Sequence, residues 1–125
     1  MEENEISYKI RGCIFAVYNA LGPGLLESVY EAALSYELAK TGLNVKAQVP
    51  IPALYRDIKL ELGFRADMIV EDKVIIEVKS VENIAEVHHK QVITYLKLTG
   101  LKLGILVNFN SDNIDNSIYR KVNNL

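Results

Sequence analysis

The sequence predicts a mixed α/β domain whose elements follow the order α-α-β-β-β-α-β. Three observations lead to this fold class. Apolar residues recur at helical spacing over residues 4–20. Two apolar strands, with the alternating pattern of a sheet, are joined by a short polar turn near residues 71–73. A helical segment at residues 84–99 then separates the third strand from the fourth. It is long enough for a crossover, which implies a mixed sheet with one parallel pair.

Two helices come first in this order. The apolar stripe of the first helix recurs at helical spacing and consists of Ile6, Ile10, Cys13, Ile14, Val17 and Leu21. The stretch Gly22-Pro23-Gly24 ends this helix, and Gly22 suits a left-handed cap. The second helix is expected to begin near Leu25, to run to Lys40 and to close at Gly42.

Four strands and a third helix follow. Residues 45–55 are expected to form a strand that is broken or lies at the sheet edge, because Pro50 and Pro52 cannot donate to a hydrogen-bond ladder. A turn at Arg56-Asp57 leads into a strand at residues 58–70. The remaining strands are expected at residues 74–79 and 103–109. In the polar tail, a short strand or helical turn is expected to dock through Ile118, Tyr119 and Val122.

Length and composition indicate one soluble domain. The 125 residues fit a single domain, residues 1–125, and half of them are hydrophobic, enough for a real core. The single cysteine, Cys13, excludes an intrachain disulfide and a cysteine-based zinc site. No apolar run approaches the ~18 residues of a membrane span, and the start Met1-Glu2-Glu3 is unlike a signal peptide. The expected location is the cytoplasm. The net charge of −2 argues against tight non-specific binding to nucleic acid.

The two strands on either side of the turn at residues 71–73 carry charges where core residues are expected. A three-residue turn makes Val70 face Val74, so that Asp67 lies across from Glu77. By the same register, Arg65 lies across from Lys79. Alternation also places four side chains of the earlier strand on one common face, namely Phe64, Ala66, Met68 and Val70.

Two carboxylates opposed at about 5 Å are destabilising unless a positive charge lies between them. A divalent metal is the simplest such charge, and Lys79 lies one pleat further on. The alternative is a structural ion network of Asp67, Glu77, Arg65 and Lys79. Burying several charges without a purpose is costly, which favours a functional site.

Four motifs in order resemble the PD-(D/E)XK nuclease superfamily and, within it, the small GxxExxY proteins. The first is Gly24-Leu25-Leu26-Glu27-Ser28-Val29-Tyr30, followed by Arg65-x-Asp67 and by Glu77-Val78-Lys79. The fourth is His88-x-x-Gln91-x-x-x-Tyr95-Leu96. The resemblance spans roughly residues 8–122 and implies a restriction-endonuclease-like core. The chain departs from the pattern in lacking a proline before Asp67 and in carrying His89, and neither departure is expected to affect metal binding.

The resemblance implies a metal site and a set of catalytic residues. Asp67 and Glu77 would bind Mg²⁺ or Mn²⁺, with the Val78 carbonyl as a third oxygen ligand. Lys79 would orient or activate the attacking water and stabilise developing charge. The family match suggests that Glu27 points at the metal, through water. The position of Glu27 in the first turn of its helix would otherwise be explained by the helix dipole.

Four further side chains are candidates by the same resemblance. Gln91 lies on the apolar stripe of its helix and is expected to face the metal or its water. Arg65 is expected to contact the substrate. For Tyr30, a contact with substrate and a place in the core are equally compatible with the sequence. For His88, a phosphate-contacting role and a purely structural one are likewise open.

These features predict a metal-dependent nuclease that hydrolyses phosphodiester bonds, with DNA the expected substrate. The alternative is a non-catalytic module that binds nucleic acid or protein and retains the nuclease fold. A third reading is a subunit that is active only as a homodimer or with a partner. The complete set of Glu27, Asp67, Glu77, Lys79 and Gln91 favours the enzyme, whereas the acidic pI near 5.7 argues against it.

Overall fold

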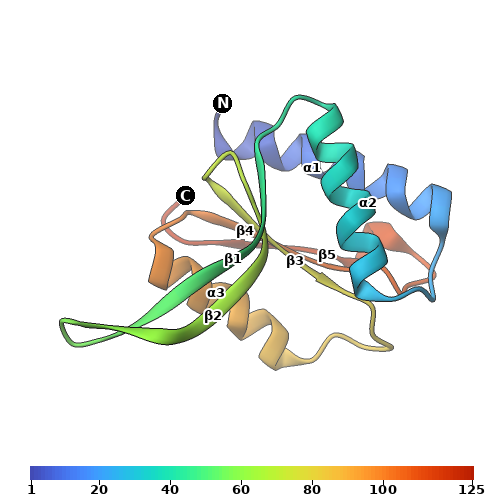
Figure 1. Cartoon of the computed structure of the whole chain (residues 1–125). Coiled ribbons are helices and arrows are strands. Elements are labelled where there is room, and N and C mark those ends of the chain that lie inside the picture. Colours follow the sequence, from blue (N-terminus) through green and yellow to red (C-terminus); the bar gives the residue numbers. More distant parts are fainter.

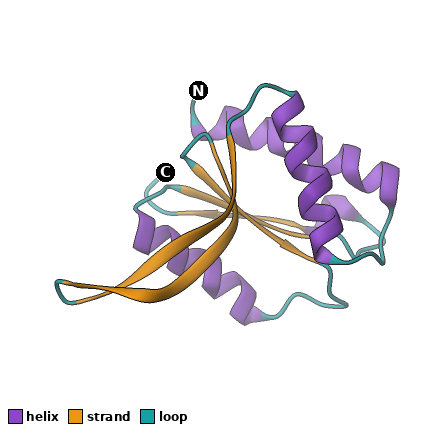
Figure 2. Ribbon diagram, in the orientation of Figure 1, coloured by secondary structure: helices purple, strands orange, loops and turns teal.

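The computed structural model describes the backbone of residues 1–125 and every side chain except those of Glu61 and Leu62 (Figures 1 and 2). The three helices are α1 (Glu3–Leu21), α2 (Glu27–Lys40) and α3 (Glu86–Thr99). The strands are β1 (Val45–Tyr55), β2 (Ile58–Val70), β3 (Val74–Lys79), β4 (Leu103–Asn108) and β5 (Ile118–Val122), and a 3-10 turn, η1 (Ile114–Ser117), precedes β5. Within the described part of the chain, no helix is long and apolar enough to cross a membrane.

The five strands form one mixed sheet in the order β1-β2-β3-β4-β5. Only β3 and β4 run parallel, and α3 is the crossover that joins them. The predicted element order, the parallel pair and the position of the first strand at the sheet edge are therefore confirmed. The tail forms the short strand that the sequence left as one of two alternatives, and β5 pairs with β4.

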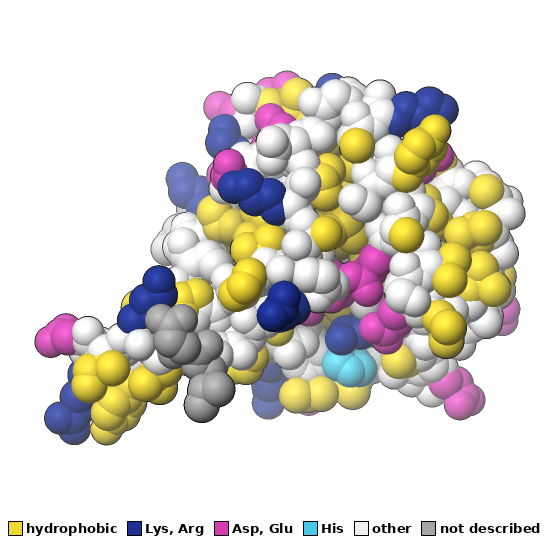
Figure 3. Space-filling model, viewed as in Figure 1, with side chains coloured by type: hydrophobic (Ala, Val, Ile, Leu, Met, Phe, Trp, Pro, Cys, Tyr) yellow, Lys and Arg dark blue, Asp and Glu magenta, His cyan; other side chains and the backbone are white. Residues whose placement is uncertain are grey.

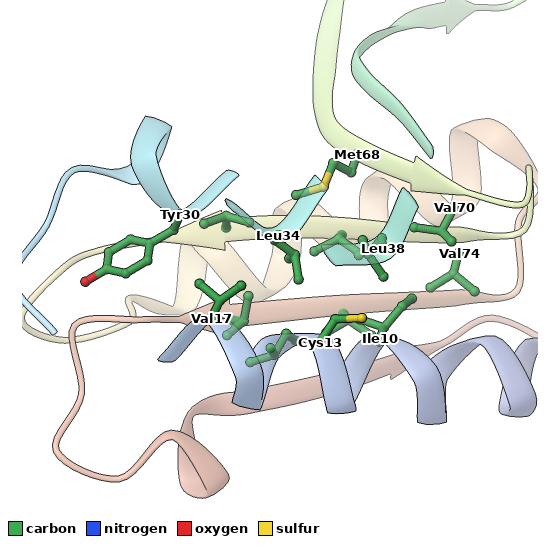
Figure 4. Packing of buried hydrophobic residues seen from close by; sticks show 14 of the residues in the cluster. Ile10, Cys13, Val17, Tyr30, Leu34, Leu38, Met68, Val70 and Val74 are labelled. Atoms are coloured by element: carbon green, nitrogen blue, oxygen red, sulfur yellow. The ribbon is translucent and has the colours of Figure 1, made fainter. Parts of the chain in front are cut away.

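The sheet separates two layers of helix. Helices α1 and α2 cover one face, and α3 covers the other (Figure 2). On the first face the α1 stripe packs against α2 and against Met68, Val70 and Val74 of the central hairpin (Figure 4). Cys13 lies in this core as a small apolar residue, and burial raises the pKa of its thiol. The smaller cluster on the second face includes Tyr95 and Leu96 of α3.

The turn between β2 and β3 has the predicted length. Val70 pairs with Val74 and Met68 with Ile76, which is the register that places Asp67 and Glu77 at equivalent positions. Glu71 and Asp72 both have φ of 55°, the left-handed conformation that a tight turn of this kind uses. The regular β2–β3 ladder ends at the pair formed by Met68 and Ile76.

Two expectations about the central strands are wrong. Phe64 and Ala66 contact the α3 side of the sheet, whereas Met68 and Val70 pack against α1 and α2. Simple alternation fails because the side chains of β2 before and after Asp67 alternate out of step with one another. At this residue β2 leaves β3 and continues with β1 into a hairpin beyond the sheet (Figure 1). For the same reason Arg65 does not lie across from Lys79, since β2 and β3 have already separated there.

Candidate metal and phosphodiester site

The site begins where β2 and β3 separate, a point that we call the fork. The Asp67 amide donates to Oε2 of Glu77 at 2.7 Å, and the Val78 amide donates to Oδ2 of Asp67 at 2.8 Å. Each carboxylate thus takes the place of a backbone carbonyl that the ladder would otherwise supply. These reciprocal bonds fix both side chains at the fork, where they face the same space between the strands.

Burial makes both of these carboxyl groups hard to ionise. Glu77 is only 3% exposed, and its pKa is raised to about 8, first by burial and then by the charge of Asp67. Burial likewise raises the pKa of Asp67, although the hydrogen bond from the Val78 amide acts in the opposite direction. The pair therefore holds less negative charge at neutral pH than two free carboxylates. A cation between them would lower both pKa values and favour the ionised forms.

Lys79 ends β3 beside these carboxylates. Its backbone pairs with Asn108 of β4, and its side chain is half-buried. The Lys79 charge counteracts the rise in pKa of both carboxyl groups, so the ammonium lies within electrostatic reach of them. Figure 3 shows acidic side chains near the middle of the visible face, next to a histidine and a Lys or Arg side chain.

On the α3 side, Tyr95 lies closest to the fork. Its hydroxyl is 3.4 Å from the Arg65 carbonyl, and burial together with the charge of Glu77 raises its pKa to about 12. Gln91 lies one turn earlier, is half-buried and is near enough to the Tyr95 hydroxyl to lower its pKa, against the larger effect of burial. The amide predicted to face the site therefore lies beside Tyr95.

Glu27 is the first residue of α2 and approaches the fork from the opposite layer. Its Oε2 accepts a hydrogen bond from the Ser80 amide at 3.3 Å, just beyond the end of β3. Its charge raises the pKa of Asp67, which places the two carboxylates in one electrostatic environment. Ser80 also donates through its hydroxyl to the Leu25 carbonyl, so it ties the start of α2 to β3.

The structure places Tyr30 in the core, which is one of the two roles that the sequence left open. Its side chain is fully buried and stacks on Phe109, with ring centroids 4.5 Å apart and planes 5° from parallel. Its hydroxyl donates to the Gly22 carbonyl at 2.5 Å and accepts from the Leu25 amide at 3.1 Å. Tyr30 therefore holds the loop before α2, and with it the position of Glu27.

The two histidines make contacts that support the fold. Nδ1 of His88 accepts a hydrogen bond from the Ala85 amide at 3.0 Å and so caps the start of α3. His89 packs edge-on against Tyr119, and its Nδ1 is buried without a hydrogen-bond partner among the described residues. Burial lowers the pKa of His89, which keeps its ring neutral. For His88, the cap is the structural alternative that the sequence left open.

Two neighbours of Asp67 were missed by the sequence analysis. Glu31, one turn after Glu27 on α2, has a raised pKa, first because of burial and then because of the Asp67 charge. Its Oε1 accepts from Nε2 of Gln48 at 2.6 Å. Gln48 stands opposite Asp67 in the β1–β2 register with φ of 52°, and its side-chain amide lowers the pKa of Asp67, against the larger effect of burial. The four-residue spacing of Glu27 and Glu31 was a usable signal, whereas nothing in the sequence marked Gln48.

Arg65 lies outside the carboxylate cluster. Its side chain is exposed, and Nη1 donates to the Gln48 carbonyl at 3.2 Å. This bond ties the guanidinium to β1, at the residue that stands opposite Asp67. The predicted contact with substrate requires such an accessible position.

The donor set fits a hard divalent cation that keeps most of its water. Asp67 and Glu77 supply carboxylate oxygens, and Val78 could add its main-chain carbonyl. Among the described residues, no three Asp, Glu, His or Cys side chains are gathered closely enough to enclose a metal. Zinc, which prefers nitrogen and sulfur ligands, is therefore a poor match. Glu27 is not placed as a third direct ligand, which leaves it a role through water.

Comparison with known families agrees with this geometry. A family model described as the PD-(D/E)XK nuclease superfamily matches residues 4–121, which is nearly the whole chain. Neither the curated proteins nor the solved structures gave a match.

Proposed function

Because the chain belongs to the PD-(D/E)XK nuclease superfamily, we propose that it hydrolyses phosphodiester bonds of DNA with Mg²⁺ or Mn²⁺ as cofactor. The observation that carries this proposal is the Asp67–Glu77 pair beside Lys79, in which each carboxylate accepts a hydrogen bond from a backbone amide of the facing strand. Burial of two acids next to one lysine is costly in a purely structural role. A bound divalent cation would compensate the charge.

The chain supplies the groups that such a reaction requires. Asp67 and Glu77, with the Val78 carbonyl, would hold the ion. When bound, the metal would lower the pKa of a coordinated water and neutralise charge on the phosphate. Lys79 would orient the attacking water and stabilise the negative charge that develops on the phosphate oxygens. Glu27 would accept a hydrogen bond from water on the α2 side.

Gln91 and Tyr95 support the site from the α3 side. The Tyr95 hydroxyl, beside Gln91, donates to the backbone carbonyl of Arg65, two residues before Asp67. The phenol is protonated at neutral pH, and its raised pKa extends this donor role to alkaline pH. We assign this pair to positioning of β2 and of ordered water.

The test is cleavage of labelled single-stranded DNA, duplex DNA and RNA in Mg²⁺, Mn²⁺ or EDTA. The wild type should cut DNA only with metal, and Lys79→Ala should lower the rate about a hundredfold or more. Lys97→Ala is the matched control, because Lys97 is an exposed cation on α3. That variant should cut at the wild-type rate.

Cleavage that persists in EDTA, or that Lys79→Ala retains in full, would contradict the proposed chemistry. A wild type that binds nucleic acid in the presence of metal but cuts none of the substrates would favour the non-catalytic module instead.

A further inference from the structure

The hairpin formed by β1 and β2 extends beyond the sheet (Figures 1 and 2). We call residues 49–64 the hairpin arm. Strand β2 runs without interruption from the tip of the arm to Asp67, so the arm is part of the same strand that carries the site. At about 3.3 Å per residue, the tip near Ile58 lies roughly 30 Å from Asp67. The base of the arm therefore lies within a few residues of the candidate site.

A pocket of about 290 Å³ opens at the base of the arm. Pro50 and Pro52 line one side, and Lys59, Phe64 and Arg65 line the other. The β1–β2 register shifts between Ile51 and Ala53, which interrupts the ladder at this level.

Gly63 makes the shape of the pocket possible. A Cβ at this position would lie 2.1 Å from the Ile51 carbonyl oxygen and 2.7 Å from the Pro52 Cα. Both obstacles are backbone atoms, so a larger residue would force the two strands apart. The prolines lack amide hydrogens, so the outer edge of β1 cannot be extended by another strand at these positions. This argues against pairing with a further β-strand as the purpose of the arm.

An aromatic ring forms one wall of the pocket and connects it to the site. Phe64 is 41% exposed, and its ring packs against Tyr95 with centroids 5.4 Å apart and a 50° tilt. Tyr95 in turn lies close enough to Glu77 for that charge to affect it. The exposed part of the Phe64 ring is therefore held in place on the α3 side of the sheet, beside Tyr95.

Two cations complete the pocket. Lys59 is exposed, and the Arg65 guanidinium is positioned by its bond to the Gln48 carbonyl. An aromatic face next to two cations matches the base and the phosphates of a nucleotide, respectively. A base can enter such a pocket only if its faces are not stacked on neighbours within a duplex.

We propose that this pocket is a subsite for one unpaired nucleotide of the substrate strand, flanking the phosphodiester that is cut. Phe64 stacks on the base, while Lys59 and Arg65 contact the phosphates. The substrate class is therefore a single strand or an unpaired end. The proposal takes its phosphodiester substrate from the proposed function and adds the strandedness of that substrate.

Binding in EDTA tests this without any need for cleavage. Fluorescence anisotropy with a short labelled oligothymidylate, alone or in a duplex, measures affinity over a range of salt concentrations. The single strand should bind more tightly than the duplex. Phe64→Ala removes packing against Tyr95 as well as stacking, so Phe64→Leu is used beside it to keep an apolar side chain there. Phe64→Leu should lose about tenfold in affinity, and Phe64→Tyr should retain it.

Lys59→Ala should weaken binding and make the slope of log affinity against log salt shallower by about 0.7, the value for one phosphate contact on a single strand. Two variants serve as controls. Tyr55→Ala removes an exposed aromatic ring at the tip of the arm, outside the pocket, and Lys97→Ala removes a cation on α3. Both should bind like the wild type.

Equal affinity for single strand and duplex, or unchanged binding by Phe64→Leu and Lys59→Ala, would overturn the subsite. A change confined to self-association, measured by light scattering, would overturn it in favour of contact between copies of the chain. A wild type that cuts nothing but shows the expected binding differences would refute the nuclease and support the subsite.

Discussion

The Asp67 amide donates a hydrogen bond to Glu77 at the point where β2 and β3 separate, and the neighbour of Glu77 donates one back to Asp67. The Asp67 amide reaches the Glu77 carboxylate, and the Val78 amide reaches the Asp67 carboxylate. The same two bonds that replace the sheet ladder also fix one oxygen of each carboxylate at the point of separation. The interruption of the sheet and the candidate site therefore have one cause, and removal of either acid is expected to affect both.

Stability should fall with rising pH in the absence of metal. The pKa of Glu77 is about 8 in the folded protein against an ordinary 4.5, so the folded state binds the proton more tightly than the unfolded state. The free energy of unfolding should therefore decrease between these two pH values, by at most about 1.4 kcal/mol per pH unit from this one group. Urea unfolding in EDTA across this range measures the slope.

The control for this pH effect is Glu77→Gln, which keeps an acceptor for the Asp67 amide but carries no titrating proton. Its unfolding free energy should vary less with pH than that of the wild type. Saturating Mg²⁺ should flatten the wild-type slope as well, because the ion favours the ionised pair. Identical slopes for wild type and variant would show that Glu77 titrates normally.

Tyr30→Phe should destabilise the protein. The change removes the hydroxyl partner of the part-buried Gly22 carbonyl and Leu25 amide, which costs about 1 kcal/mol. Tyr36→Phe is the matched control, since Tyr36 on α2 is 66% exposed and should tolerate the loss. Urea unfolding compares the two. Unchanged stability with a raised KM in Tyr30→Phe would instead support a direct contact with substrate.

Two glycines test the packing of the helices. A Cβ on Gly104 of β4 would lie 2.6 Å from Cγ1 of Val92, so Gly104→Ala should cost about 1–3 kcal/mol of stability. A Cβ on Gly12 of α1 would meet no heavy atom within 4 Å, so Gly12→Ala should stabilise the helix by about 0.5–1 kcal/mol. In urea unfolding, a Gly104→Ala protein as stable as the wild type would contradict the packing of α3 on β4, and a destabilised Gly12→Ala would contradict the open space beside α1.

The element order and the β2–β3 register could be predicted because they depend on local patterns. The three residues after Val70 set the pairing, and the apolar spacing set the helices. The change of facing within β2 could not be predicted in this way. Alternation assumes a regular strand, whereas the structure has a left-handed residue at Gln48, opposite Asp67, and a fork beside it.

The candidate site was predictable to a similar extent. The roles of Asp67, Glu77 and Lys79 remain proposals, but the structure brings these residues together. Tyr30 shows what a motif cannot predict. The motif marks the position of this tyrosine, but its role in the core is evident only from its packing against Phe109. Gln48 reaches Asp67 from another strand, and such long-range neighbours leave no mark in the local sequence.

The most direct test of the metal site is the melting temperature with and without Mg²⁺ or Mn²⁺. Metal that binds only the folded state stabilises by RT ln(1 + [L]/Kd), about 2.7 kcal/mol at a hundredfold excess over Kd. The wild type should therefore gain several degrees. Asp67→Asn should lose most of that gain and should be more stable than the wild type in EDTA. Its amide oxygen can still accept from Val78, and the charge beside Glu77 is gone. A wild type that is indifferent to metal, together with a destabilised Asp67→Asn, would identify a structural ion network and contradict the nuclease.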